Sequence, residues 1–157
     1  MLGTRPSRHP NYMPNMADIS EWATFKADAS FDSREQWPGY IHGIRDQQRC
    51  GSCWAFGAVE SMSDRICISS NQKLQTRISA ADMLSCCGSG CGSGCNGGYP
   101  GGAMNFWKNH GVVTGGLYNT TNWCYPYQFA PCDHHTEGKY GPCGASQRTP
   151  ACHTQCV

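Results

Sequence analysis

Twelve cysteines among 157 residues are the feature that most constrains what this chain can fold into. Such a density is typical of oxidising compartments, where each disulfide stabilises a small core by about 2–4 kcal/mol. Only 15% of the residues are charged, 39% are hydrophobic and 19 are glycine. This composition predicts a loop-rich globular chain that forms one domain, or part of a larger one, rather than a disordered chain.

An N-glycosylation acceptor at Asn119, in the sequence Asn-Thr-Thr, also indicates a secretory route, ending in lysosomes or outside the cell. Residues 1–5 contain no apolar signal core, and no apolar run is long enough to cross a membrane. We therefore expect the sequence to begin inside a longer gene product. The net charge of +1, without long runs of either sign, predicts neither nucleic-acid nor membrane binding.

Three segments are predicted to be helical. Apolar residues recur at helical spacing from 52 to 65, and we expect most of them to pack in the core. A second helix is expected to begin at Ser79, with Asp82 placed to complete a capping box. A third is expected over 101–109, closed by Gly111 as its C-terminal cap. The remaining segments show little periodicity.

Cys53 lies at the predicted first turn of the first helix, in the sequence Cys-Gly-Ser-Cys-Trp at 50–54. Helix N-terminal amides and the helix dipole stabilise a thiolate, which is the nucleophilic form of cysteine. In this interpretation Cys53 attacks a carbonyl, and its own N–H and the Gln47 side-chain amide stabilise the oxyanion. Cys50 then anchors the loop through a disulfide.

The same cysteines allow two other interpretations. A redox pair of Cys50 and Cys53 requires a buried strand leading into it, but residues 45–49 are polar. Half of a zinc site requires a second Cys-x-x-Cys pair, which the cysteines between 86 and 95 do not offer. The spacing therefore favours a nucleophile, and we expect no metal and no cofactor.

The sequence at 50–54 has the signature of papain-like proteases, and more of the chain resembles cathepsin B-like members of that family. The matching segments are 30–38, 44–47, 50–60, 63–68, 86–88, 95–100 and 132–135. The resemblance implies an α+β, papain-like cysteine protease fold. Residues 27–157 would form its N-terminal helical half, with a central helix, disulfide-rich loops and an occluding loop at about 132–143. Residues 1–26 would be the C-terminal tail of a propeptide, cut near Lys26.

The resemblance also implies a set of substrate-binding residues. Backbone groups of Gly97 and Gly98 would pair with an extended substrate, although these glycines could simply permit a tight turn. Tyr99 and Pro100 would line the wall of a side-chain pocket, although an aromatic residue there could equally be core. Trp54 would also belong to this set.

Two adjacent histidines, His134 and His135, fall in the occluding loop of the resemblance. Protonated at acidic pH, they would accept a substrate's C-terminal carboxylate, so that dipeptides are released as well as internal bonds cut. We hypothesise an ion pair between His134 and Asp46 that holds the loop down. The alternatives are a solvated turn or a metal pair, which would lack a third ligand.

The disulfide pairing follows from the resemblance. It pairs Cys50–Cys95, Cys86–Cys152, Cys87–Cys91, Cys124–Cys156 and Cys132–Cys143. The family has a further cysteine after its Trp-Pro, bonded to the position of Cys67, and residues 37–41 lack it here. Cys67 is therefore predicted to be a free thiol on the buried side of its helix.

The family's catalytic histidine and asparagine lie in its second, β-barrel-like half, which we expect to be absent here. None of the six histidines stands in that context; they are His9, His42, His110, His134, His135 and His153. We therefore predict a cathepsin B-like thiol peptidase of polypeptides, bound by protein inhibitors of thiol proteases, of which this fragment alone is inactive. The alternatives are a non-catalytic, cysteine-rich secreted binding module or a pseudogene product.

Overall fold

The computed structural model describes residues 29–157, so the predicted propeptide tail (1–26) and the cut near Lys26 lie outside the described residues. The helices are α2 (Ser33–Gln36), α3 (Cys53–Ser69), α4 (Ala80–Cys86), the 3₁₀ helix η1 (Gly88–Gly90) and α5 (Pro100–His110). Over residues 29–157 only isolated β-bridges accompany them. This helical architecture is the one expected for the helical half of the fold.

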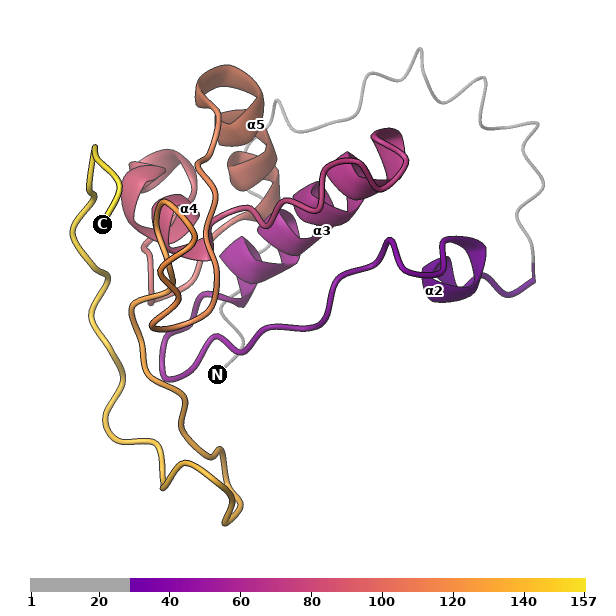
Figure 1. The fold of residues 1–157 in the computed structure, drawn as a ribbon. Helices are drawn as coiled ribbons and strands as arrows, with labels where there is room; N and C mark the ends of the chain where they lie inside the picture. The colour runs from indigo at the N-terminus through magenta and orange to yellow at the C-terminus, as the bar shows by residue number, and fades with distance from the viewer. Residues whose placement is uncertain (1–28) are drawn as a thin grey trace.

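Helix α3 lies at the centre, with α5 above it and the segment that precedes it below in Figure 1. Both α4 and α5 pack against it. Its buried residues occupy most of its length and are Trp54, Ala55, Phe56, Ala58, Val59, Met62, Ser63 and Cys67. The helix runs four residues beyond the predicted end at 65, because the buried Cys67 extends its packed face by another turn.

Helix α4 begins as predicted, but half of its expected capping box is wrong. The Ser79 hydroxyl oxygen accepts a hydrogen bond from the Asp82 N–H at 3.0 Å. The Asp82 carboxylate does not return to Ser79; it accepts from the N–H of Val113 at 3.0 Å, and the Ser79 N–H donates to the Val113 carbonyl. The distant Val113 N–H is therefore the partner of the Asp82 carboxylate, in place of the local Ser79 N–H. Burial raises the pKa of Asp82, and the Val113 hydrogen bond opposes this.

Helix α5 is one residue longer at each end than predicted. Pro100 occupies its first turn, where a missing N–H costs nothing. Gly111 closes it with φ 80°, and its N–H donates to the Trp107 carbonyl at 3.0 Å. The predicted glycine cap is confirmed. A side chain at Gly111 would disfavour this positive φ.

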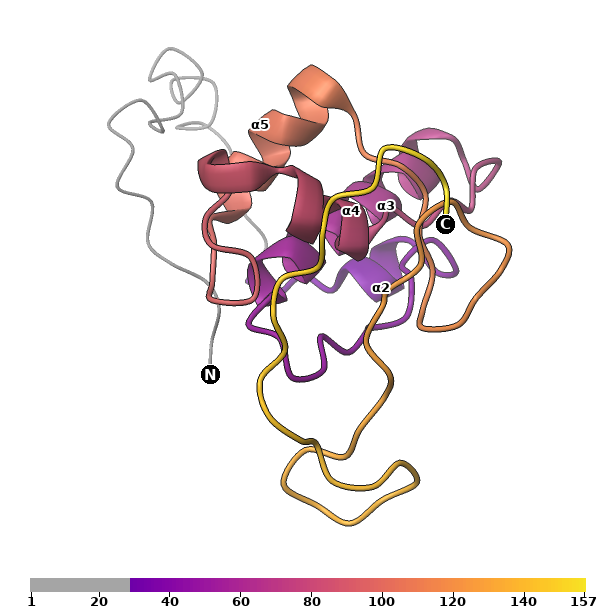
Figure 2. The same cartoon turned by 90° about the vertical axis from the view of Figure 1, so that its left-hand side faces the viewer.

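Five disulfides link segments that share little regular structure. They are Cys50–Cys95, Cys86–Cys152, Cys87–Cys91, Cys124–Cys156 and Cys132–Cys143, the pairing that the resemblance implied. Cys53 and the fully buried Cys67 lie outside them. The bonds at Cys152 and Cys156 hold the C-terminal segment, yellow in Figures 1 and 2, alongside α4 and the preceding loop.

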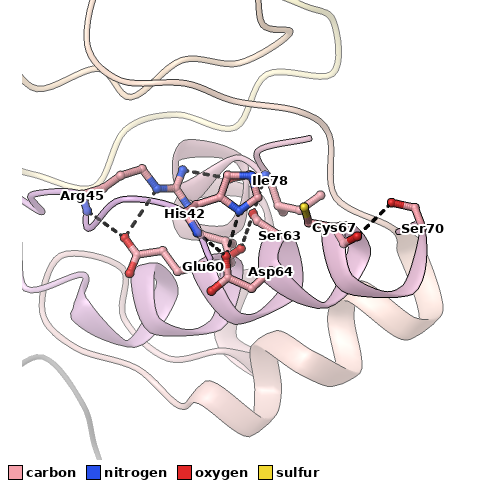
Figure 3. A network of polar contacts seen from close by, with 9 residues as sticks. His42, Arg45, Glu60, Ser63, Asp64, Cys67, Ser70 and Ile78 are labelled. Carbon is pink, nitrogen blue, oxygen red and sulfur yellow. Dashed lines mark hydrogen bonds and ion pairs between the residues drawn. The ribbon is translucent and has the colours of Figure 1, made fainter. Parts of the chain in front are cut away.

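A polar network fixes the segment before the nucleophile along α3, and Figure 3 shows His42 and Arg45 directed toward that helix. The His42 N–H and ring Nδ1 contact one Asp64 oxygen at 2.9 and 2.8 Å. The Arg45 side chain is only 3% exposed, and its Nε lies 3.5 Å from Glu60. Its Nη1 donates to the Ile78 carbonyl at 3.0 Å. Burial lowers the pKa of Arg45, and Glu60 opposes that shift.

Replacing the buried guanidinium should therefore destabilise the fold. We expect Arg45→Ala to lower the free energy of unfolding by about 3 kcal/mol, because Glu60 and the Ile78 carbonyl lose their buried partner. Urea unfolding of the oxidised chain measures this. The matched control is Arg34→Ala, which removes an exposed pair with Asp32 and should not move the midpoint. Equal midpoints for the two variants would contradict the role assigned to Arg45.

Candidate active site

Cys53 is the first residue of α3 and is partly exposed. Ser52 precedes it as the N-cap, but the Ser52 side chain makes no capping hydrogen bond. The carbonyl of Ser52 instead accepts the N–H groups of Ala55 and Phe56 at 2.9 and 3.1 Å. Cys53 therefore stands at the N-terminal, positive end of a 17-residue helix.

The loop before Cys53 is held by the Cys50–Cys95 disulfide and by the Gly51 N–H, which donates to the Cys95 carbonyl at 2.8 Å. Because Cys50 is bonded to Cys95, the structure pairs neither Cys50 with Cys53 as a redox couple nor Cys50 with a metal. The adjacent Trp54 is only 1% exposed, and its indole N–H donates to the Gly94 carbonyl. Trp54 thus supports this loop, and its assignment as a substrate-binding residue stays a prediction.

The two glycines expected to pair with substrate have different surroundings. Gly92 and Gly98 form an antiparallel bridge whose hydrogen bonds come from the flanking residues, so the N–H and C=O of the buried Gly98 point away from Gly92. Gly97 instead donates to Gly94 at 3.2 Å and accepts from Ser93 at 2.8 Å. Both backbone groups of Gly97 are therefore used by its own turn, and its assignment as a substrate-pairing residue stays a prediction.

The site also needs Gly98 for steric reasons. A Cβ there would lie 2.3 Å from the Cys91 carbonyl oxygen and 2.6 Å from the Trp54 ring. Tyr99 and Pro100 follow directly, as the N-cap and first residue of α5, and both are half-buried. Their place in a side-chain pocket stays a prediction.

A hollow of about 470 Å³ brings Cys53 together with Gln47. It is lined by Ile44, Arg45, Asp46, Gln47, Cys53, Phe56, Gly57 and Glu60. Within the described part of the chain, this lining contains no histidine. The Gln47 Oε1 atom is buried without a hydrogen-bond partner. An amide and a thiol that face one hollow can together bind and attack a carbonyl group.

The occluding-loop segment projects away from the helices in Figures 1 and 2 and is closed by Cys132–Cys143. The Cys132 N–H donates to Gln48 Oε1 at 2.9 Å, which ties the base of the loop to the segment beside Cys53. His134 Nε2 lies 3.3 Å from Asp46 Oδ1, the hypothesised pair, with the two side chains 36% and 49% exposed. His135 is exposed and has φ 57°.

One group of potential metal ligands occurs in this loop. The ligand atoms of Cys132, His134 and Cys143 lie within 4.8 Å of one another. The two sulfurs are bonded to each other, however, and metal binding requires thiolates. His134 therefore gains no second ligand from these cysteines while the disulfide is intact.

Sequence reasoning missed Gln48 and Tyr127. The Tyr127 hydroxyl donates to the Gln47 carbonyl at 2.7 Å and lies 3.1 Å from Ser52 Oγ. Its ring packs edge-on against Phe56, with 4.8 Å between centroids. Burial raises the pKa of Tyr127, so the hydroxyl stays protonated. The only local signal was an aromatic residue after Pro126, in a segment predicted to be loop.

Comparisons with known proteins show the family to which the chain belongs. The family described as papain family cysteine protease matches residues 27–156. Cathepsin B-like cysteine proteinase 6 of Caenorhabditis elegans is 54% identical over 132 residues, which are 82% of this chain and 35% of that protein. The cathepsin B-like cysteine proteinase of Schistosoma japonicum is 52% identical over 134 residues, 82% of this chain and 38% of that protein.

A solved structure is similar as well. Procathepsin B S9 from Trypanosoma congolense superimposes with a TM-score of 0.67 at 31% identity, over 99% of this chain and 46% of that one. The chain thus spans little more than a third of the length of the two curated relatives. No helix in the described residues is both long and apolar enough to cross a bilayer.

Proposed function

Because this chain belongs to the papain family of cysteine proteases, we propose that its protein hydrolyses peptide bonds through a covalent acyl-enzyme on Cys53. The observation that carries the proposal is the shared hollow of Cys53 and Gln47 at the N-terminus of α3. The Cys53 sulfur attacks the substrate carbonyl. Its backbone N–H and the Gln47 side-chain amide donate to the oxygen as negative charge develops there.

A polypeptide substrate would bind beside Cys53 in an extended conformation. The N–H and C=O of Gly98, which point away from Gly92, offer one residue of strand pairing. Tyr99 and Pro100, next in sequence, would form one wall of the pocket for a substrate side chain. Protein inhibitors of thiol proteases would occupy the same surface.

The reaction also needs a group that accepts the thiol proton and returns it to the leaving amine. None of the described residues that line the hollow is an imidazole. We propose that an imidazole from outside this chain's sequence performs this step, as the family's arrangement implies. The 157-residue chain alone would then carry a reactive Cys53 but hydrolyse peptides very slowly.

The test supplies the missing part. The chain is fused to the portion of the Schistosoma japonicum relative that it does not match. Activity is then measured as the hydrolysis of a peptide reporter with Phe-Arg before the scissile bond. We expect turnover from this protein, labelling of Cys53 by a peptidyl epoxide, and loss of both in Cys53→Ser. The chain alone should show at least a hundredfold less turnover, the usual effect of a missing acid–base group. Turnover that survives Cys53→Ser, or epoxide labelling of another residue, would contradict the assignment of Cys53 as the nucleophile.

We further propose that the occluding loop makes the enzyme release C-terminal dipeptides. His134 and His135 are exposed in this loop, and His134 faces Asp46 at 3.3 Å. In its charged form, His134 would form an ion pair with Asp46 that holds the loop against the Asp46 segment. The held loop would block long substrates and present the histidines to a terminal carboxylate.

In the fused protein, His134→Ala should raise internal cleavage of a long peptide and lower dipeptide release, each about threefold at acidic pH. Asp46→Asn should change the ratio in the same direction, because it removes the other charge of the pair. Glu137→Gln, an exposed change in the same loop, is the control and should leave the ratio unaltered. A ratio that does not change in either pair variant would refute the role of this ion pair.

We also propose that the protein matures in the secretory pathway toward an acidic vesicle or the cell exterior, carrying a glycan on Asn119. Five disulfides support this route. Asn119 is exposed at φ 58°, in a turn where the Thr120 hydroxyl donates to the Leu117 carbonyl at 2.8 Å. The sugar would therefore extend into solvent.

A pair of neighbouring substitutions tests the glycan. Thr121→Ala destroys the acceptor motif, whereas Thr120→Ala leaves it intact. When the chain is secreted from a eukaryotic host, the wild type and Thr120→Ala should both lose apparent mass on treatment with an amidase specific for N-glycans. Thr121→Ala should not. An unglycosylated wild type would count against this site.

A further inference from the structure

The hydroxyl of Tyr127 joins the two sides of the site. It lies 2.7 Å from the carbonyl oxygen of Gln47, which can only accept a hydrogen bond, so Tyr127 donates its single proton there. In the 3.1 Å contact with Ser52 Oγ, Tyr127 is then the acceptor and Ser52 the donor, and the Cys50 carbonyl lies farther from Ser52 Oγ, at 3.5 Å. The result is a directed series from Ser52 through Tyr127 to Gln47. Ser52 is the residue immediately before Cys53.

The Tyr127 ring is held firmly behind this hydroxyl. It is 5% exposed and packs edge-on against Phe56 of α3 and against Phe129, at centroid distances of 4.8 and 5.3 Å. The Tyr127 N–H donates to the Gly116 carbonyl at 3.2 Å. Packing and backbone thus define where the hydroxyl stands, before any substrate binds.

Gln47, by contrast, has few anchors of its own. Its side-chain Oε1 is buried without a hydrogen-bond partner, so no bond at that atom orients the amide. Its neighbour Gln48 has φ 57°, a conformation that non-glycine residues seldom adopt. The Tyr127 hydrogen bond therefore fixes the Gln47 peptide at the point where the chain turns.

We propose that Tyr127 is a positioning residue that holds Gln47 at the correct place relative to Cys53 for oxyanion stabilisation. The proposal rests on the proposed function, because it concerns the same carbonyl attack. Oxyanion donors act only when they are already in place as charge develops, and small displacements weaken them steeply. The Tyr127 ring sets one side of that geometry and Ser52, next to Cys53, sets the other.

The test separates carbonyl attack from thiol reactivity. Iodoacetamide alkylates the Cys53 sulfur by displacing iodide, which needs no oxyanion donor. A peptidyl aldehyde instead accepts the sulfur at its carbonyl carbon, and the resulting alkoxide takes up the proton that the thiol gives. Mass spectrometry of the oxidised 157-residue chain measures the alkylation rate of Cys53, and protection by the aldehyde gives its Kd. The buried Cys67 is the internal reference for the alkylation rate of Cys53.

Tyr127→Phe should alkylate within twofold of the wild type and bind the aldehyde about three- to tenfold more weakly, because the neutral hydrogen bond that positions Gln47 is lost. The matched control is Tyr125→Phe. Tyr125 is equally buried, and its hydroxyl donates to the Ala151 carbonyl, far from Gln47 in the bonding network. Aldehyde binding by Tyr125→Phe should equal that of the wild type. Equal aldehyde Kd values for Tyr127→Phe and Tyr125→Phe would overturn the inference. So would a loss in the alkylation rate of Tyr127→Phe as large as its loss in aldehyde binding.

A double-mutant cycle tests whether Tyr127 acts through Gln47. In a Gln47→Ala background, Tyr127→Phe should weaken aldehyde binding no further. Additive losses would mean that Tyr127 acts by another route and would overturn the inference alone. If the wild type alkylates at Cys53 but binds no aldehyde, the carbonyl attack itself is wrong, and the proposed function fails together with this inference.

Discussion

The burial of α3 is the constraint on which the rest of the structure depends. Helices α4 and α5 pack on it, and Arg45 lies against it from the segment that leads to the nucleophile. Fully burying a large apolar side chain contributes about 1.5–3 kcal/mol, and α3 supplies Trp54, Phe56 and Met62 to that core. The same helix begins at Cys53. Packing that stabilises the domain thus also places Cys53, the proposed nucleophile, at its surface.

Disulfides and polar contacts extend this arrangement where apolar packing ends. Beyond α5 the described chain has no regular helix, and the bonds of Cys124, Cys132 and Cys152 hold it in place by reducing the entropy of the unfolded chain. Around the site, the Cys50–Cys95 disulfide is joined by hydrogen bonds of Gln48 and Tyr127. Covalent links therefore fix the course of the chain, while buried polar groups fix the finer geometry beside Cys53.

Sequence patterns predicted those features whose cause is local. The apolar stripe indicated α3, Ser79 marked the start of α4, and Gly111 marked the end of α5, because caps and helical spacing act within a few residues. An expectation failed where a distant group competed. Asp82 bonds to Val113, 31 residues away, instead of completing its cap.

By itself, the sequence determined a cysteine-rich, loop-rich chain with a thiol at the N-terminus of a helix, since composition and hydrophobic periodicity are properties of neighbouring residues. The family resemblance added the disulfide pairing, which spacing cannot decide among so many cysteines. Only the tertiary structure decided which glycine has backbone groups that point away from its bridge partner and which hydroxyl anchors Gln47. Tyr127 lies 80 residues from Gln47 along the chain, and two residues brought together by folding leave no periodic trace in sequence.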